Sequence, residues 1–351
     1  MKVFNKDYRS IWAKYDEKKI FIINQTLLPF QFEIKELTSV NDVYTAIKNL
    51  EVRGAPAIGI AAAFGMWLSF YRNNANKEKI LNDYNYLISC RPTAVNLQIG
   101  ATYVLNKIIN SKDEKEIFLE ANYFAEREII ACKSIGLNGL SIIKKLYEKK
   151  QSTINILTHC NAGWLACGDY GTALAPIFEA NRNNIPVHVW VDETRPLNQG
   201  SRLTAWELHH ESIPYHIISD NTGGLLIMKN KVDIVLVGAD RIAKNGDVAN
   251  KIGTFLKALA ANEYKIPFYV AAPTSTFDKN ILTGNDIIIE ERNQNELKKI
   301  FALTDDKKIK EFSIIPEEFV TCNYAFDITP AKFITGYITE QGIFDNINDI
   351  L

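Results

Sequence analysis

Short apolar runs and then helical periodicity characterise the first 150 residues of the chain. The apolar runs at 19–23 and 31–34 predict two short strands, with a turn at Leu28-Pro29 between them. Apolar residues spaced three or four positions apart predict helices over 39–49, from Pro56 to Tyr71, and at roughly 77–90, 94–110 and 114–148. The last helix should break near Gly136-Leu137-Asn138-Gly139, because glycine weakens a helix interior.

From Gln151 onward, apolar runs of strand length alternate with helical segments. Strands are predicted at 154–158, 187–191, 215–219, 233–237 and 268–271. Helices are predicted at 168–180, 201–211, 222–229 and 250–263, and Thr329-Pro330 should open a last one. Such alternation implies βαβ units and a parallel sheet. The fold class is therefore α/β, with a boundary near 145–152 between an N-terminal, mainly helical domain (1–148) and a parallel α/β domain (149–351).

Composition and charge exclude several classes of partner. Net charge is −1, from 40 basic and 41 acidic residues, so neither nucleic acid nor an anionic membrane is expected to bind. The uncharged segment 55–71 is rich in Ala and Gly and is better interpreted as a buried core helix than as a membrane span. The N-terminus lacks the apolar core of a signal peptide, and five irregularly spaced cysteines are typical of a reducing cytosol. We therefore expect a cytoplasmic location.

Two reactive side chains stand where predicted strands end. Cys160 follows the run 154–158, and Asp240 follows 233–237. Ligands of open α/β sheets bind at the carboxyl ends of strands, so a thiol and a carboxylic acid there predict acid–base chemistry on a small molecule. A helix N-terminus at the βα turn would lower the pKa of the thiol, and burial would raise that of Asp240. The alternative for Cys160 is a buried, inert cysteine, and the alternative for Asp240 is an N-cap or a partner of an arginine. If the strand continued, His159 would face the side opposite to Cys160. A zinc site is not expected here.

Polar residues in neighbouring turns suit an anionic sugar. Arg53 stands at a Gly/Pro-rich turn that opens a helix, and Arg91 stands before Pro92 with Thr93 as an N-cap. Each could be purely structural. The polar loop 191–204, which includes Gln199, suits hydroxyl and phosphate contacts, although an ion-pair network competes as its explanation. Asn250 and Lys251, at the start of the next predicted helix, could hold a hydroxyl and a phosphate. The chain lacks Gly-x-Gly-x-x-Gly and P-loop motifs, which weakens dehydrogenase and nucleoside triphosphatase interpretations.

Seven runs together resemble the methylthioribose-1-phosphate isomerases of methionine salvage. They are Val52–Gly59, Arg91–Leu97, His159–Gly163, Val191–Pro196, Gln199–Leu208, Gly238–Ala243 and Asn245–Thr254. The similarity extends from residues 24–29 to 326–330, nearly the whole chain. That family shares its fold with regulatory subunits of the guanine-nucleotide exchange factor of translation initiation. The resemblance implies an N-terminal helical domain with a small β-sheet and a C-terminal Rossmann-like domain.

The resemblance also implies an activity and a set of roles. The activity is aldose–ketose isomerisation of 5-methylthioribose 1-phosphate to 5-methylthioribulose 1-phosphate, by a cytoplasmic homodimer without metal or organic cofactor. Cys160 and Asp240 would be the catalytic pair. The small-molecule sugar phosphate would be held by Arg53, Gly54, Ala55, Arg91, Gln199, Asn250 and Lys251.

Several positions depart from the family pattern and keep alternatives open. Asn24 stands where Asp is usual, Trp164 and Cys167 stand where smaller or hydroxyl residues are usual, and 197–198 and 222–224 are also unusual. A 5-deoxyribose 1-phosphate isomerase is therefore an alternative, as is a non-catalytic regulatory subunit of the same fold. A redox protein would need a Cys160–Cys167 disulfide. A ribose 1,5-bisphosphate isomerase would need a second basic cluster, and Trp164 suits a thioether better.

The chemistry expected of the pair starts with ring opening, because phosphate on the anomeric oxygen leaves no free aldehyde. Asp240, kept protonated by burial, would donate a proton to the ring oxygen. Cys160 would then assist transfer of hydrogen from C2 to C1, either as a base through an enediol-like intermediate or during a hydride shift. The sequence leaves both routes open.

Overall fold

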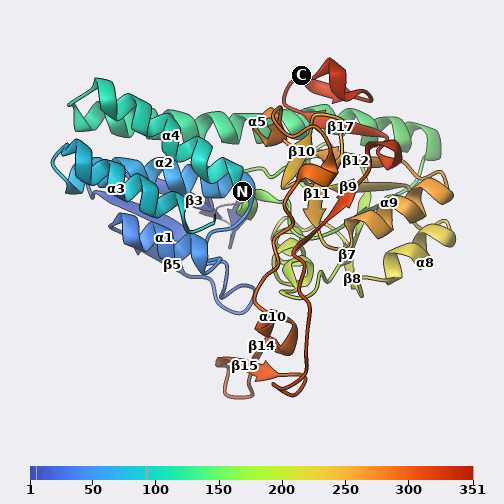
Figure 1. Ribbon diagram of the computed structural model, residues 1–351. Coiled ribbons are helices and arrows are strands. Elements are labelled where there is room, and N and C mark those ends of the chain that lie inside the picture. The colour runs from blue at the N-terminus through green and yellow to red at the C-terminus, as the bar shows by residue number, and fades with distance from the viewer. Residues whose placement is uncertain (5, 92–93, 351) are drawn as a thin grey trace.

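The computed structural model describes residues 1–4, 6–91 and 94–350. The N-terminal half is mainly helical, as expected, with a three-stranded antiparallel sheet, β3-β4-β5, against the helices (Figure 1). Its strands are β1 (Lys2–Val3), β2 (Lys6–Asp7), β3 (Ile11–Lys14), β4 (Lys19–Ile23) and β5 (Ile34–Leu37). Its helices are α1 (Val40–Lys48), α2 (Ala55–Arg72), α3 (Lys77–Ile88), α4 (Val95–Asn110) and α5 (Glu114–Lys150). The predicted second strand, 31–34, is shifted to Ile34–Leu37.

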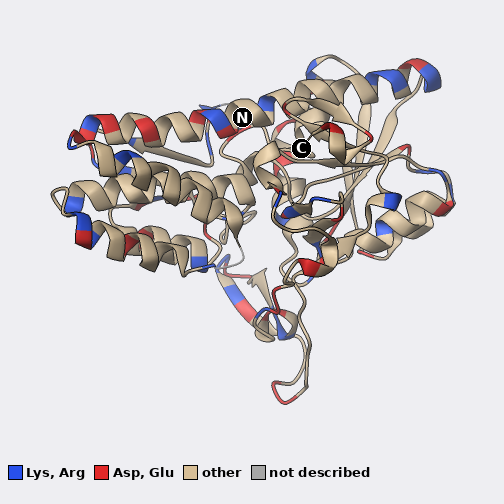
Figure 2. Ribbon diagram, turned by 45° about the horizontal axis from the view of Figure 1, so that its top comes forward, with Lys and Arg blue, Asp and Glu red and all other residues tan. Residues whose placement is uncertain are grey.

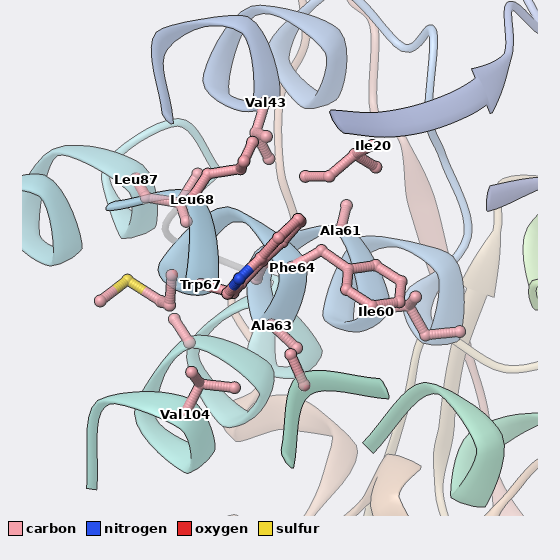
Figure 3. Close-up of a cluster of buried hydrophobic side chains, with 14 of the residues drawn as sticks. Ile20, Val43, Ile60, Ala61, Ala63, Phe64, Trp67, Leu68, Leu87 and Val104 are labelled. Atoms are coloured by element: carbon pink, nitrogen blue, oxygen red, sulfur yellow. The ribbon is translucent and has the colours of Figure 1, made fainter. Parts of the chain in front are cut away.

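Helix α2 is the centre of this half. Its residues 56–70 are all buried, and Phe64 and Trp67 fill the space between α1, α3, α4 and β4 (Figure 3). Small residues permit this close packing: a Cβ on Gly100 of α4 would lie 2.1 Å from the Gly59 carbonyl oxygen of α2. The uncharged segment is thus a core helix, as predicted. None of the helices in the described ranges has the length and apolarity needed to cross a membrane.

Helix α5 runs unbroken past the predicted break at 136–139. It is 37 residues long and packs on α2 in one half of the molecule and on α6 (Ala175–Arg182) and β17 (Gly336–Thr339) in the other (Figure 1). Its glycines allow helices to approach rather than ending one: a Cβ on Gly139 would lie 2.4 Å from Pro176 Cγ of α6. Because α5 supports both halves, the division at 148/149 stays a prediction.

The second half is built on a seven-stranded sheet in the order β18-β17-β12-β9-β6-β7-β8. All neighbours are parallel except β17 and β18. The strands are β6 (Ile154–Thr158), β7 (Val187–Asp192), β8 (Tyr215–Ile218), β9 (Ile234–Val237), β12 (Phe268–Ala271), β17 (Gly336–Thr339) and β18 (Gly342–Phe344). From β8 to β17 this is the Rossmann order 3-2-1-4-5-6, which reverses direction between β6 and β9. The predicted parallel, Rossmann-like domain is confirmed.

Most of the remaining helices flank this sheet, and they refine the predictions. Those beside the sheet are α6, α7 (Ala205–His210), α8 (Thr222–Met228) and α9 (Thr254–Glu263), with a π-helical turn over Gly200–Thr204; the short α10 (Asn295–Lys298) lies away from the sheet, next to the segment 299–313 (Figure 1). The helix predicted from residue 168 begins only at Ala175, because the preceding segment turns back through Gly168 and Gly171, both with positive φ. The predicted N-cap Thr93 lies outside the described residues.

A second, four-stranded sheet corrects two further predictions. Its order is β13-β10-β11-β16, from Phe277–Asp278, Arg241–Ala243, Val248–Lys251 and Phe326–Thr329. Asn250 and Lys251 therefore end a strand, and α9 starts only at Thr254, after a left-handed Gly253. Thr329-Pro330 leads into a single 3₁₀ turn over Ala331–Phe333 in place of a last helix, because the chain next enters β17.

One segment stands apart from both sheets. The hairpin β14 (Lys299–Leu303) and β15 (Ile309–Ser313) projects away from the body of the molecule (Figure 1). Charges of both signs are interspersed along the helices and on this hairpin (Figure 2).

Candidate active site

The reversal of strand order brings the two predicted reactive residues together. Cys160 follows β6 and Asp240 follows β9, so both lie at the crevice where Rossmann-like sheets bind ligands. One pocket is lined by all nine predicted site residues, namely Cys160, Asp240, Arg53, Gly54, Ala55, Arg91, Gln199, Asn250 and Lys251. These side chains come from segments 200 residues apart in the sequence. The pocket also contains Arg292 and Phe326, which the sequence analysis did not single out.

Cys160 is held by its backbone with the thiol directed into the pocket. Its φ is +64°, its N–H donates to Thr194 Oγ1 at 2.9 Å, and its carbonyl oxygen accepts from Thr204 Oγ1 at 2.7 Å. Its Sγ lies 3.3 Å from Gln199 Oε1. Burial raises the pKa of the thiol, and the charges of Lys251 and Arg53 only partly oppose this. The expected lowering by a helix N-terminus is wrong, because a 3₁₀ turn over Trp164–Ala166 follows and α6 starts 15 residues later.

Asp240 is an exposed residue that lines the pocket, although enough protein lies around its carboxyl to remove part of its hydration. Its backbone N–H donates to the Ala249 carbonyl oxygen at 2.9 Å, which fixes it beside β11. Removal from bulk water raises the pKa of its carboxyl, in the direction expected, and the positive charges of Lys251, Arg91 and Arg53 oppose that rise. Such a carboxyl retains its proton to higher pH than an exposed aspartate does.

Positive charge gathers around the pair. Arg53 is buried and donates from Nη1 and Nη2 to the side-chain and backbone oxygens of Asn161, each at 2.6 Å. Lys251 is buried, forms no ion pair with any described residue, and has its ammonium 4.9 Å from the Phe326 ring centre. Burial lowers the pKa of Lys251. An anionic ligand would supply the countercharge that these groups lack.

Arg91 and Arg292 complete the basic side of the pocket and share one carboxylate. Arg91 Nη2 lies 3.3 Å from Glu290 Oε2, and Arg292 Nη1 lies 3.2 Å from Glu290 Oε1. The two arginines hold the pKa of Glu290 below its usual value despite burial. The sequence signal for Glu290 and Arg292 was a sudden charged run, Glu290-Glu291-Arg292, directly after three consecutive isoleucines.

His159 also lines the pocket, but both nitrogens of its ring are engaged in a buried cluster beside it. Its Nδ1 lies 2.8 Å from Asp192 Oδ2 and its Nε2 2.8 Å from the Ile252 carbonyl oxygen. Lys257 Nζ lies 2.9 Å from the same Asp192 oxygen, and all three side chains are buried. The structural explanation for part of the polar loop is thus confirmed at Asp192. His159, Asp192 and Asp220 are near enough to share a metal ion, but Lys257 already neutralises Asp192, and Asp220 accepts from the N–H groups of Thr194 and Arg195.

Trp164 does not line the pocket, contrary to the expectation that it would meet a thioether. It is fully buried, with its ring centre 6.0 Å from that of Trp206. Cys167 does line the pocket and packs on Cys132 of α5, and all five cysteines are free thiols. Glu207 was not selected from the sequence either. The available signal was a single carboxylate among the mainly apolar residues 203–208. Glu207 is completely buried, which raises the pKa of its carboxyl to about 7.

The chain is similar over nearly its whole length to proteins of known name. Residues 51–346 match the Initiation factor 2 subunit family. Methylthioribose-1-phosphate isomerase of Escherichia coli O45:K1 is 45% identical over 98% of this chain and 93% of its own length, and that of Sulfurimonas denitrificans is 46% identical over 98% of each. The crystal structure of 5-methylthioribose 1-phosphate isomerase from Pyrococcus horikoshii OT3 covers 98% of this chain and 96% of its own, with TM-score 0.84 and 36% identity.

A second structural relative has a different description. The crystal structure of translation initiation factor eIF-2B, subunit delta, from A. fulgidus covers 98% of this chain and 99% of its own, with TM-score 0.80 and 36% identity. The fold alone therefore does not separate enzyme from initiation factor. This chain belongs to the Initiation factor 2 subunit family, in which its full-length relatives at 44–47% identity are methylthioribose-1-phosphate isomerases.

Proposed function

We propose that this chain is an aldose–ketose isomerase that converts 5-methylthioribose 1-phosphate to 5-methylthioribulose 1-phosphate. The observation that carries the proposal is the shared pocket: Cys160 and Asp240 end adjacent strands and face a basic wall. The names of the full-length relatives support the substrate. A purely regulatory chain of this fold would need neither a thiol nor a proton-retaining carboxyl at this crevice.

The phosphate would bind between α2 and β11. The backbone N–H groups of Gly54 and Ala55 open α2, and Arg53 and Lys251 bring positive charge from either side. Gly54 cannot carry a side chain here, because its Cβ would lie 2.4 Å from Ala166 Cβ and its φ is +91°. Arg91 would add charge at the rim. Gln199 and Asn250 present amide groups to the same space and suit the sugar hydroxyls.

Ring opening would start the reaction. The neutral Asp240 carboxyl donates its proton to the ring oxygen as the bond from that oxygen to C1 breaks, which leaves Asp240 as a carboxylate. The positive charge that develops at C1 is shared with the phosphate-bearing oxygen. A hydrogen must then move from C2 to C1 while the C2 hydroxyl gives up its proton to become the ketone, and return of that proton to the Asp240 carboxylate, directly or through water, restores the acid.

Two routes for that hydrogen remain in the proposal. In the first, a Cys160 thiolate removes the C2 proton and an enol phosphate is reprotonated at C1. In the second, C2 transfers hydride directly to C1, and Cys160 serves as a neutral wall that excludes water. The raised pKa of the thiol favours the second route, because a thiolate is costly at this position. Complete retention of a C2 deuterium in the product would rule out the first.

The test is turnover of two sugars in parallel. Purified protein is incubated with 5-methylthioribose 1-phosphate and with 5-deoxyribose 1-phosphate while ketose formation is followed. Asp240→Asn and Cys160→Ser serve as matched inactive variants. Turnover that disappears in both variants establishes the isomerase, and the ratio of kcat/KM values names the substrate. No turnover of either sugar would contradict the proposal and favour the regulatory interpretation.

We further propose a cytoplasmic homodimer. Free thiols at all five cysteines are typical of a reducing compartment. Large apolar side chains are exposed on the projecting hairpin and its flanks, at Phe301, Leu303, Phe312, Phe319 and Val320. Such clustering is common where a second chain binds. Sedimentation equilibrium across a hundredfold range of concentration would measure the mass, and a monomer throughout would contradict the dimer.

A further inference from the structure

Glu207 lies beneath the loop that carries Cys160 and does not itself line the pocket, although it contacts Asn161, which does. It is the third residue of α7, and its side chain is completely buried. Three donors converge on its two oxygens: Asn161 Nδ2 at 2.9 Å, Trp164 N–H at 2.9 Å and Leu165 N–H at 3.2 Å. Gly163 passes so close that a Cβ there would lie 1.8 Å from Glu207 Oε2. The loop 161–165 is therefore folded around this one carboxyl.

The contacts continue from Glu207 to the basic wall. Asn161 donates its amide hydrogens to Glu207 and to Thr204 Oγ1, at 2.9 and 3.1 Å, so its amide oxygen must point the other way. That oxygen and the Asn161 backbone oxygen accept the two Nη groups of Arg53. The orientation of the Arg53 guanidinium is thus set by an asparagine whose own orientation is set by Glu207.

We propose that Glu207 is a positioning residue, which in its ionised form aligns Asn161 and Arg53 to bind the substrate phosphate. The inference rests on the proposed function for the identity of the substrate. Binding of any other phosphate-bearing ligand in this pocket would depend on Glu207 in the same way. A carboxylate can accept all three donors, whereas a protonated carboxyl must itself donate from one oxygen. Protonation therefore loosens the loop and turns Arg53 away from its bound orientation.

Glu207 ionises in a range that makes this alignment adjustable. Burial raises the pKa of Glu207 to about 7, with the three hydrogen bonds and the Arg53 charge opposing the rise. Among the described segments that pack against Glu207, the charged group that faces its carboxyl is Arg53. On its own segment, Arg202 donates to the carbonyl oxygens of Thr26 and Leu28, and His210 packs on the Trp206 ring. A fall in pH through about 7 should therefore weaken phosphate binding.

The decisive experiment compares Glu207→Gln with the wild type and with Glu263→Gln, an exposed glutamate at the end of α9. KM and kcat for 5-methylthioribose 1-phosphate are measured from pH 6 to pH 8.5. The neutral glutamine mimics the protonated acid, so we expect KM about tenfold above wild type at pH 8 and within about twofold at pH 6. The control should follow the wild type throughout. The second ionisation of the substrate phosphate, near pH 6, is common to all three proteins and cancels in the ratio. A KM ratio that is constant with pH would overturn the proposal.

Inorganic phosphate provides a readout that requires neither turnover nor a folded Glu207 variant. Calorimetry gives the Kd for phosphate as a function of pH, for the wild type and for Asn161→Ala. In the wild type, protonation of Glu207 should weaken phosphate binding as the pH falls. In Asn161→Ala this contribution should be lost, so that only the ionisation of phosphate itself changes the Kd with pH. If ionised Glu207 favours phosphate binding, phosphate binding must in turn favour ionised Glu207. Adding phosphate near pH 6.5 should therefore decrease the intensity of the infrared band of the protonated Glu207 carboxyl. Identical pH curves for the two proteins would overturn the inference. A wild type that binds phosphate in this way but converts no sugar would contradict the proposed function alone.

Discussion

His159 and Cys160 are consecutive residues at the end of β6, yet they belong to two polar clusters of opposite kinds. The cluster of His159, Asp192 and Lys257 is closed: a carboxylate, an ammonium and an imidazole are buried against one another. The cluster of Cys160, Asp240 and Lys251 is open, because its groups face a pocket and shift each other's pKa without direct ion pairs. In the closed cluster Asp192 Oδ2 is paired twice, although Asp192 Oδ1 is buried without a hydrogen-bond partner among the described residues. The difference indicates that polar groups paired within the protein stabilise the fold, whereas polar groups that face a pocket unpaired can bind a ligand.

The largest effect on activity is expected from substitutions in the open cluster of Cys160, Asp240 and Lys251. Cys160→Ala and Asp240→Asn should each lower kcat/KM by about 10²–10⁴-fold, because Asp240 donates the proton that opens the ring and Cys160 either removes the C2 proton or excludes water from the hydride shift. The free energy of unfolding should change by less than about 0.5 kcal/mol for Asp240→Asn, since among the residues that the structure describes its carboxyl has no hydrogen-bond or ion-pair partner. Steady-state kinetics and urea unfolding measure both. An Asp240→Asn protein with near-normal turnover would remove this residue from the acid role.

The closed side should respond in the opposite way. Asp192→Ala leaves Lys257 buried without its countercharge and His159 without its Nδ1 partner, so we expect a loss of about 3–5 kcal/mol in the free energy of unfolding. Urea unfolding of the purified variant measures this. Residual folded protein at low temperature should still convert sugar with a KM close to that of the wild type. A large rise in KM with unchanged stability would place Asp192 in the open cluster.

A substitution remote from both clusters sharpens the distinction. Gly139→Ala places a Cβ 2.4 Å from Pro176 Cγ at the contact of α5 and α6, and such overpacking costs about 1–3 kcal/mol. Thermal unfolding should show the loss while KM stays unchanged. Leu137→Ala, at an exposed position of the same helix, is the matched control and should leave the stability nearly unaltered. If Gly139→Ala were as stable as the control, the interpretation of Gly139 as a close-approach residue would be wrong.

The pH dependence is the smallest expected effect. The raised pKa of Asp240 means that its neutral form persists above the usual range, so kcat should fall about tenfold per pH unit above that pKa, as the acid loses its proton. The sign for stability is the same: the contribution of neutral Asp240 is complete below its unfolded pKa and is lost as pH rises through the folded pKa. Profiles of kcat for the wild type and for the residual activity of Asp240→Asn test this; an alkaline limb that survives in the variant belongs to another group.

Much of this architecture could be predicted from local pattern. The strands 154–158 and 268–271 were located to the residue, because short, predominantly apolar runs bounded by polar turns have few other interpretations. The failures share a cause. Gly136 and Gly139 suggested a break in α5, but tertiary packing against α6 favours glycine at both positions, and no local signal distinguishes a break from a close approach. The placement of Asn250 and Lys251 in a strand likewise depends on pairing with β16, some 75 residues away.

The candidate site was predictable where strand order mattered and not where packing did. Cys160 and Asp240 could be selected as strand ends, and the structure brings them into one pocket with the seven other residues selected. The environment of each was harder to foresee: the thiol lacks the expected helix N-terminus, Trp164 faces the core, and Arg292 arrives from a distant loop. These features depend on which segment packs against which, and that information is spread over the whole chain.

The left-handed backbone of Cys160 has a consequence for how this fold diversifies. A cysteine at φ +64° is strained by about 1 kcal/mol relative to glycine, which adopts that conformation freely. While the thiol is needed, selection for activity retains the strained residue. A lineage relieved of the chemistry would gain stability by exchanging it for glycine or asparagine. We therefore expect non-catalytic relatives of this fold to carry glycine or asparagine at this turn more often than cysteine.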